Sequence, residues 1–566
     1  MSCLLLIVSG LALAAAPSQY DVAFSTYLGG SNFDAIRDVA VDHQGNIVVV
    51  GGTASSDFPV TPGAYQQKLS PAGPTCGRLG ATDAFIAKFS PQGQLIWCTY
   101  LGGPGYDRAY AVEVDQQDRI IVAGRAGEGF PTTAGAFQPN FIDTFPSTGN
   151  VDKAEYGKQN GFVSVFTTGG AMVWSSYVWY GQLCRDVAVD DAGDIYLPSG
   201  WNGNVYAPNP PPPDLSGFKK KPNLPLEAGK SNTGNLGAGD NCVLKVKGDG
   251  SRILWGTWLS GSKDDSQEAM VRVDADHNVY YSNFTHSDDN PVNPQDRGIH
   301  THAADGGKDD MYLAKISADG NTLIYGTYIG GNNYDELDTH QLAIDRQGNA
   351  YLDFSSRSTD LPTTPGTMLP TYPAGSQEPL DYLCKIGPDG ALLQGTYLPS
   401  TTHQIPEGLS VDGEGNVYMT GATHSPDMPV TGNAYQKARG DETNDYVAPG
   451  ITASNCGFFT VIAADFKSLI YSTHFGKGSS LIHYNPDGTF KHYNAYGGFN
   501  ASVLAPDGSF VAVGSWHSPG LPLINAWQDK YHGGPLSGAS DSVKHCDAVI
   551  IRFVPVIPEP AKPKSP

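Results

Sequence analysis

The chain has 566 residues, a charged fraction of only 16% and a formal net charge of −22. Its 68 glycines, 41 prolines, 29 tyrosines and 22 phenylalanines favour short strands joined by tight turns over a helical bundle or a coiled coil. So acidic a chain also argues against nucleic acid or an anionic lipid surface as its partner, because both attract basic faces.

The first element is an apolar run from Leu4 to Ala16, which has the length of a signal peptide and is too short to span a bilayer. Small residues at its end suit cleavage, although no Lys or Arg precedes Arg37. We expect residues 1–16 to be a signal peptide and the mature protein to be secreted, periplasmic or on the cell surface. No later stretch approaches the about 20 apolar residues of a membrane helix, so no transmembrane segment is expected. The Pro-rich end, 556–566, is predicted to be a disordered tail.

Between these ends, two phrases alternate along the chain. The phrase VAVDHQGNIVVVGGT (39–53) returns at 112–126, 187–200, 271–285, 342–356, 409–423 and 502–516. The phrase DAFIAKFSPQGQLIWCTYLGG (83–103) returns at 161–181, 241–261, 310–331, 381–398 and 457–476. Each phrase alternates apolar and polar residues around a turn, which is the pattern of a β-hairpin. Two hairpins per unit predict a four-stranded propeller blade, with strands A to D in chain order.

Counting the phrases predicts seven blades. The A–B phrase occurs seven times, whereas the C–D phrase is complete only six times. The ends of the chain supply the missing halves, because 22–30 reads as a D strand without a C strand and 547–553 as a C strand without a D strand. Pairing these halves would close the ring and leave no exposed edge. We therefore predict an all-β, single seven-bladed β-propeller over residues 17–555.

Segments between the phrases carry a further recurring motif: SSDFPVTPGAYQ (55–66), GFPTTAGAFQ (129–138), STDLPTTPGTM (358–368) and SPDMPVTGNAYQ (425–436). With the flanking A-V-D-x-x-G-N and Y-L-G-G phrases, the chain resembles the SBBP family of exported bacterial propeller proteins. The A–B phrases also resemble NHL-type blades. Blades 3 and 4 depart from the pattern, because they lack the D-F-P-x-T segment. The resemblance implies a propeller outside the cytoplasm and brings no catalytic motif.

Insertions are expected on one face of the propeller. The A–B and C–D turns are short, whereas the B–C connections are long, and one D–A connection, 478–499, also carries an insertion. Because B–C and D–A connections share a face, which we call the upper face, function is expected there. The B–C segments are 67–82, 139–160, 201–240, 286–309, 369–380, 437–456 and 529–546.

The residues just before each A strand should ring the upper mouth of the central channel. By register with Val39 they are Arg37, Tyr110, Arg185, Ala269, His340, Gly408 and Asn500. We predict that Arg37, Tyr110, Arg185, His340 and Asn500 bind an anionic or sugar ligand, with arginine giving bidentate contacts. The alternative is that Arg37 and Arg185 only pair with nearby carboxylates such as Asp34 or Asp186.

Other candidate sites are weaker. The pairs Asp264–Asp265, Asp288–Asp289 and Asp309–Asp310 could attract calcium, but no EF-hand loop surrounds them, so solvated loops are expected. The aspartates of the V-D-x-x-G-N turns are explained by turn geometry. His300 and His302 lack a third metal ligand nearby and are interpreted as loop histidines. The stretch PNPPPPD (208–214) with KKK (219–221) is either a docking loop or an exposed spacer.

Seven cysteines follow the predicted signal peptide, and none is part of a C-x-x-C pair: Cys76, Cys98, Cys184, Cys242, Cys384, Cys456 and Cys546. In an exported protein they allow up to three disulfides with one thiol left over, and buried free thiols are the open alternative.

Two functions remain open. The first is a binding or scaffold module, expected to be a monomer, that recognises a protein or glycan through its upper loops. The second is an extracytoplasmic enzyme, a polysaccharide lyase or hydrolase, with its site at the channel mouth. No G-x-S-x-G, H-E-x-x-H or P-loop motif occurs, so no metal or other cofactor is expected and the binding role is preferred.

Overall fold

The computed structural model of the protein describes most of residues 16–556. The residues outside the description are 1–15, 78, 144–155, 179–182, 201–240, 262, 264, 267, 289, 293–308, 337–339, 374–378, 401–403, 424, 426, 441–450, 454–455, 478–480, 485–489, 495–497, 534–545 and 557–566. The predicted signal peptide and tail, the segments 208–214 and 219–221, and His300 and His302 therefore lie outside, or almost wholly outside, the described residues.

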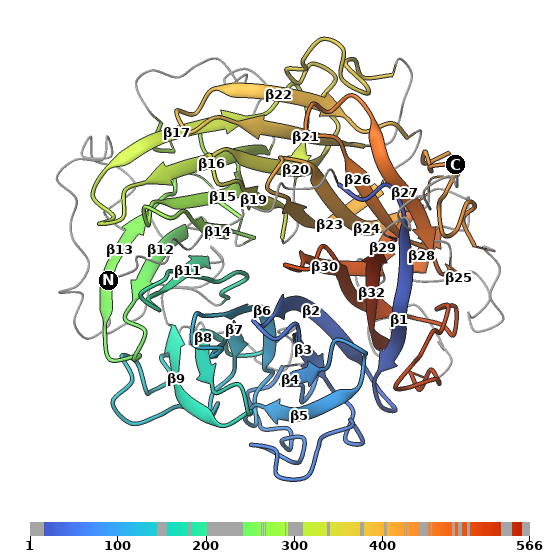
Figure 1. The fold of residues 1–566 in the computed structure, drawn as a ribbon. Coiled ribbons are helices and arrows are strands. Elements are labelled where there is room, and N and C mark those ends of the chain that lie inside the picture. The colour runs from blue at the N-terminus through green and yellow to red at the C-terminus, as the bar shows by residue number, and fades with distance from the viewer. Residues whose placement is uncertain are drawn as a thin grey trace, which may run out of the picture.

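Seven antiparallel sheets stand around a ring like the blades of a propeller (Figure 1), which confirms the predicted fold. Blade 1 is β2 (Asp34–Val41), β3 (Ile47–Thr53), β4 (Asp83–Phe89) and β5 (Leu95–Leu101). Blade 2 is β6 (Arg108–Val114), β7 (Ile120–Ala126), β8 (Asn160–Phe166) and β9 (Met172–Val178). Blade 3 is β10 (Ala188–Val189), β11 (Ile195–Gly200), β12 (Asn241–Val246) and β13 (Ile253–Trp258). Blade 4 is β14 (Met270–Val273), β15 (Val279–Thr285), β16 (Asp310–Ile316) and β17 (Leu323–Ile329).

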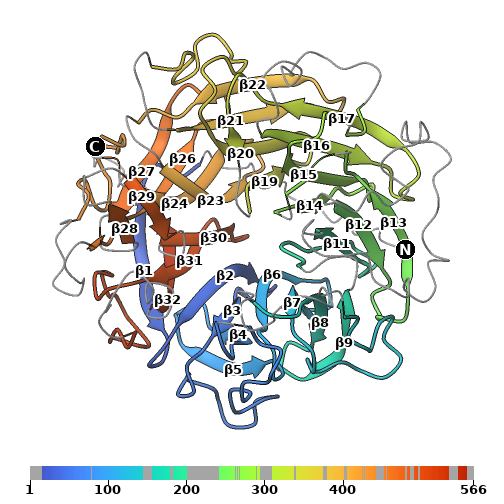
Figure 2. The same ribbon diagram turned by 180° about the vertical axis from the view of Figure 1, so that it is seen from behind.

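The second half of the ring follows the same plan (Figure 2). Blade 5 has two short inner pieces, β18 (Asp335–Glu336) and β19 (Leu342–Ile344), followed by β20 (Ala350–Ser356), β21 (Leu380–Ile386) and β22 (Leu392–Tyr397). Blade 6 is β23 (Gln404–Val411), β24 (Val417–Thr423), β26 (Cys456–Ile462) and β27 (Leu469–Phe475). Blade 7 is β30 (Gly498–Leu504), β31 (Phe510–Trp516), β32 (Asp547–Pro555) and β1 (Tyr20–Leu28). No helix occurs in the part of the chain that the structure describes.

The ring closes as the half-phrases predict. β1 pairs antiparallel with β32, from Tyr20 opposite Pro555 to Leu28 opposite Ala548. The chain's first described strand thus becomes the outer strand of the last blade. This pairing ties the two ends of the fold together without an open sheet edge between blades 7 and 1.

Both faces of every blade are buried against a neighbour. One cluster of buried side chains lies at each of the seven blade interfaces. In β3, Val49 packs toward blade 7, while Val48 and Val50 pack toward blade 2. This arrangement explains why the inner strands read as nearly continuous apolar runs instead of alternating with polar residues.

The outer strands lock adjacent blades through an aromatic residue. The Trp174 indole of β9 donates a hydrogen bond to the Gly248 carbonyl in the C–D turn of blade 3, at 3.1 Å. Gly250 in that turn has a φ of 71°, and a Cβ there would lie 2.4 Å from the Trp174 ring. Trp97 repeats the contact from blade 1 to Thr168 in blade 2. The glycine of the C–D turn is therefore required both by the turn and by the ring that covers it.

The V-D-x-x-G-N turns have the structural role predicted for them. Asp42 accepts hydrogen bonds from the backbone amides of Gln44 and Asn46, at 2.9 and 2.8 Å. Its other oxygen lies 2.7 Å from the Lys88 ammonium on β4. The same Lys–Asp pair recurs in three further blades, as Lys245–Asp190, Lys315–Asp274 and Lys385–Asp345. The aspartate thus both folds the turn and pairs with a lysine from strand C.

Long connections meet on the upper face. β25 (Ile451–Ala453), from the B–C connection of blade 6, pairs with β28 (Leu481–Tyr484) from the D–A insertion, and β28 pairs with β29 (Phe490–Asn494). In blades 1 and 2 the B–C loops touch, because the Lys158 amide donates to the Thr75 carbonyl at 3.1 Å. No helix long and apolar enough to cross a membrane occurs in the described part of the chain.

Candidate functional site

The inner strands carry an extra residue where they enter the sheet. In blade 1 the β2–β3 register skips Arg37, and in blade 2 the β6–β7 register skips Tyr110. Blades 6 and 7 skip Glu407 and Asn500 in the same way. A bulged residue has no residue directly opposite it on the neighbouring strand, and the local bend of the strand changes the direction of its side chain. In blades 1, 2, 6 and 7 the residue at the ring position is therefore a bulged residue.

One member of the predicted ring is wrong. The expected residue in blade 6 was Gly408, but Gly408 stands opposite Thr420, and the residue that the β23–β24 register skips is Glu407. Leu409 is the register equivalent of Val39, and the residue two before it, as Arg37 is two before Val39, is Glu407, so the repeat register itself gives Glu407. Glu407 is 3% exposed, so the correction places a buried carboxyl group in this ring.

Three of the predicted residues meet. The guanidinium carbon of Arg37 lies 5.4 Å from the centre of the Tyr110 ring, and that of Arg185 lies 5.3 Å from it. These residues come from three consecutive blades, so only ring formation brings them together. Guanidinium groups over an aromatic face interact favourably with its quadrupole.

Two further arginines, absent from the prediction, complete the cluster. Arg108 and Arg125 lie 5.2 and 5.3 Å from the centre of the Tyr110 ring. They face each other across the β6–β7 ladder, where blade 1 has Ala35 opposite Gly52. A comparison of the repeats could have revealed them, since both arginines stand at positions where blade 1 has a small residue. We call Tyr110 with its four arginines the arginine–tyrosine cluster.

Neighbouring groups make room for the cluster and cover it. A Cβ on Gly52 would lie 2.9 Å from Cγ of Arg108, so the glycine lets that side chain pass between blades 1 and 2. Arg108 also lies 5.2 Å from the Phe33 ring, and Arg125 lies 4.2 Å from the ring of Tyr156 in the B–C loop of blade 2. Tyr110 is only 3% exposed. The four positive charges are therefore held in a largely dry environment, where their effect on a nearby negative charge is strong.

The acidity of Tyr110 reflects this surrounding. Burial by itself would raise the pKa of Tyr110, but the positive charges of the four arginines outweigh it and lower the pKa from 10.0 to about 7. No hydrogen bond among the described residues involves the Tyr110 hydroxyl. A tyrosine of this kind can carry a negative charge, or exchange a proton, near neutral pH.

Carboxylates lie one step down the inner strands from this cluster. Asp38 accepts hydrogen bonds from the amides of Val39 and Val112, both at 2.7 Å, and so ties blade 1 to blade 2. Asp186 does the same between blades 3 and 4 and pairs with Arg272 at 2.5 Å. Arg185 pairs with Glu268, at 2.7 Å, and not with Asp186. The alternative of pairing with a neighbouring carboxylate thus holds for Arg185, though with a different partner from the one expected.

The two remaining predicted residues contact the neighbours of Arg37 in β2. His340, with a φ of 62°, has Nδ1 3.6 Å from an oxygen of Asp38. The Asn500 side chain donates to the Ile36 carbonyl at 2.8 Å and is fully buried. Asn500 therefore joins blade 7 to blade 1, and the contact assigns it a structural role.

The loop aspartates are not the solvated residues that we expected. Asp265, Asp309 and Asp310 are at most 6% exposed. Asp265 accepts a hydrogen bond from the Gly261 amide, and Asp335 accepts one from Gly331 in the equivalent loop. Asp265 and Asp335 thus close two D–A loops, which takes both carboxylates out of solvent. Of the described members of the three pairs, Asp288 is the exposed one, with Lys263 3.1 Å away, and Asp264 and Asp289 lie outside the described residues. Among the described residues, no three His, Cys, Asp or Glu side chains lie together as metal ligands would.

The seven cysteines named above are all buried and none of them forms a disulfide, so of the two alternatives the structure has the buried thiols. Burial raises the pKa of Cys184 to about 12, so this thiol is not a nucleophile at neutral pH.

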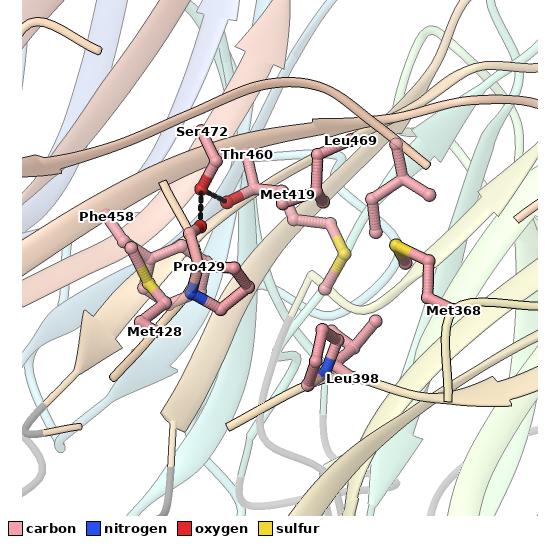
Figure 3. A pocket seen from close by; sticks show the side chains of 11 residues that line it. Met368, Leu398, Met419, Met428, Pro429, Phe458, Thr460, Leu469 and Ser472 are labelled. Carbon is pink, nitrogen blue, oxygen red and sulfur yellow. Dashed lines mark hydrogen bonds between the residues drawn. The ribbon is translucent and has the colours of Figure 1, made fainter. Parts of the chain in front are cut away.

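An apolar pocket between blades 5 and 6 is not a second site (Figure 3). Met368, Met419 and Met428 line it, and its two hydroxyl groups, on Thr460 and Ser472, hydrogen-bond to each other at 3.0 Å. Its volume of about 20 Å³ has room for one water molecule. Flexible methionines around so small a space indicate a packing gap in the core.

Comparisons of the sequence with protein families and with curated proteins give no match. Solved structures show distant likeness. A protein of unknown function from Dyadobacter fermentans is 9% identical, with a TM-score of 0.39, over 95% of this chain and 100% of that chain. BamB from Moraxella catarrhalis is 8% identical, with a TM-score of 0.34, over 94% and 99%. The WD40 β-propeller domain of Doa1 is 10% identical, with a TM-score of 0.35, over 94% and 97%. These similarities are too distant to bear on function.

Proposed function

We propose that this protein is an extracytoplasmic propeller that binds a carboxylate-bearing polysaccharide at the upper mouth of its channel. The observation that carries the proposal is the convergence of four guanidinium groups on Tyr110. Guanidinium groups bind carboxylates in bidentate geometry. Four guanidinium groups at one point match a polymer with repeated negative charges better than they match a single acidic side chain.

The setting of the proposal comes from the sequence. A signal peptide at 1–16, a propeller over 17–555, a disordered tail at 556–566 and the resemblance to the SBBP family together support a monomeric, exported binding module. The upper face supports it too, since loops of blades 1 and 2 meet there beside the cluster, through the contact of Lys158 with Thr75. Tyr156, from the same loop as Lys158, covers Arg125 and would contact a ligand that enters from this face.

Calorimetric titration with oligogalacturonate tests the proposal, with neutral oligogalactose as the control ligand. We expect oligogalacturonate to bind, and to bind more weakly as the salt concentration rises. Arg125→Gln should weaken binding at least tenfold. Arg346→Gln, an exposed arginine in the A–B turn of blade 5, is the matched control and should leave binding unchanged.

Three results would contradict the proposal. Equal binding of oligogalactose would show that the carboxylates are not recognised. Equal binding by the Arg125→Gln and Arg346→Gln variants, both folded by thermal unfolding, would place the site elsewhere. Equally tight binding of a polyglutamate peptide would indicate that the ligand is an acidic protein segment and not a polysaccharide.

One observation favours a second function at the same place, namely catalysis on the bound polysaccharide. Tyr110 ionises near neutral pH, as general acids and bases at active sites commonly do. A module that only binds an anion has no need for such a group.

A further inference from the structure

Tyr110 is placed to move a proton. Its ring is surrounded by guanidinium groups from three blades, and its hydroxyl takes part in no hydrogen bond among the described residues. Positive charges around a phenol stabilise its deprotonated form, the phenolate, which is a base. Once the phenolate has taken up a proton it is a phenol again, and the phenol is an acid. The same oxygen can therefore accept a proton and return it.

The arginines packed around Tyr110 do not accept protons, so the tyrosine itself is the group that transfers one. Four arginines lie against its ring: Arg37 from β2, Arg108 from β6, Arg125 from β7 and Arg185 from the segment before β10. Arginine stays protonated in proteins and is no base. Three carboxylates beside the cluster have partners of their own: Glu268 pairs with Arg185 of the cluster, Asp186 pairs with Arg272, and Asp38 accepts hydrogen bonds from two backbone amides.

We propose that Tyr110 is the catalytic base and acid of a β-elimination that cleaves a 4-linked uronic-acid glycan. The inference rests on the proposed function, since the glycan must first bind at the arginine–tyrosine cluster. Two properties of a uronate fit the cluster. Its carboxylate can be held by the arginines, and the hydrogen on its C5, next to that carboxylate, is acidic enough to be removed by a base.

The step balances without another reactant. The Tyr110 phenolate takes the proton from C5, and the electron pair of that C–H bond forms a C4–C5 double bond. The C4–O glycosidic bond breaks, and its electron pair stays on the leaving oxygen. The Tyr110 phenol then returns the proton to this oxygen, so that no water, oxidant or metal ion is consumed.

The arginines have a defined part in this reaction. As C5 loses its proton, negative charge accumulates on the uronate carboxylate, and preorganised positive groups lower the energy of that state. Hydrolysis fits less well. Most glycosidases use two carboxyl groups flanking the bond, whereas the groups packed on Tyr110 are arginines.

The experiment uses the full chain with polygalacturonate, alginate and a glucuronate-containing glycan, each tested separately. The ultraviolet absorbance of the unsaturated uronate reports elimination, reducing ends report any cleavage, and calorimetry reports binding. We expect an unsaturated product from at least one glycan, with a rate that rises as the pH increases through about 7.

Tyr110→Phe separates catalysis from binding. It should lower turnover by about 10²-fold or more while affinity changes less than threefold, since the ring and the arginines remain. Tyr65→Phe removes the hydroxyl of an exposed tyrosine that packs on Phe166 and is the matched control, with unchanged turnover.

Each other outcome is decisive. Binding without any cleavage would overturn the catalytic assignment and leave the proposed function standing. Reducing ends without an unsaturated product would show hydrolysis and overturn elimination. Full turnover by Tyr110→Phe, or an equal loss of affinity and turnover, would overturn the role of Tyr110. Absence of binding to all three glycans would overturn both the catalysis and the proposed function.

Discussion

Removing one side chain from the closing strand should destabilise the whole propeller. Phe24 in β1 is fully buried between blades 7 and 1, and the ring lies against Gly93 of the blade 1 C–D turn, where a Cβ would come within 2.6 Å of it. A buried phenylalanine replaced by alanine costs about 3–5 kcal/mol, because apolar contacts are lost and a cavity remains. Natural domains have only about 5–15 kcal/mol of stability, so Phe24→Ala should remove a large part of it.

Urea unfolding followed by tryptophan fluorescence measures this loss. Ile96→Ala is the matched control, because Ile96 lies on the outer strand of blade 1 and is 47% exposed. It should cost about 1 kcal/mol or less. If Phe24→Ala lowered the free energy of unfolding no more than Ile96→Ala, with equal dependence on urea, β1 would not be closing the ring.

Three further predictions follow from the buried groups. Asp353, whose carboxyl oxygens are buried without a hydrogen-bond partner, occupies the position that Val50 has in blade 1, and burial raises its pKa well above the usual value. The stability associated with its protonated form is present below about pH 4 and is lost as the pH rises through the raised pKa. Asp353→Val should therefore raise the melting temperature above that of the wild type by more at pH 8 than at pH 5. A variant that melts at the same or a lower temperature than the wild type at pH 8 would contradict this. Lys88→Ala leaves the buried Asp42 carboxylate with its turn hydrogen bonds but without its ammonium partner, and should cost about 3–5 kcal/mol in urea unfolding. Replacing the exposed Lys467 should cost almost nothing, and equal costs for the two variants would argue against the Lys88–Asp42 pair. Ellman's reagent should label the seven buried thiols only as fast as the chain unfolds, and rapid labelling of the folded protein would show that they are accessible.

Much of the fold could be predicted because it is written in local patterns. Alternating apolar residues and D-x-x-G-N turns define each hairpin within a few residues of sequence. The half-phrases at 22–30 and 547–553 then predicted the β1–β32 pairing, since an unpaired strand on each end can be satisfied by the other. Disulfide pairing had no such local signal, and the buried free cysteines became evident only from their positions in the core.

The candidate site was only partly predictable. Arg37, Tyr110 and Arg185 could be found by register, because each stands two residues before the start of a recognisable A–B phrase. Glu407, and not Gly408, stands two residues before Leu409, so it too was available from the repeat register, and the β23–β24 bulge confirms it. Asp265 was expected in solvent, because a carboxylate that accepts backbone hydrogen bonds within a closed loop looks like any other loop residue in sequence.

The sequence by itself therefore determined the strands, the number of blades and the way the ring closes, because each depends on contacts between residues near in sequence or on two complementary ends. Only the tertiary structure decided that four arginines meet around one tyrosine. Arg37, Arg108, Arg125 and Arg185 belong to three different blades, and their separation depends on how the blades stand around the channel. At distances of 5.2 to 5.4 Å, their charges act together on Tyr110, and this joint effect makes an ordinary phenol acidic.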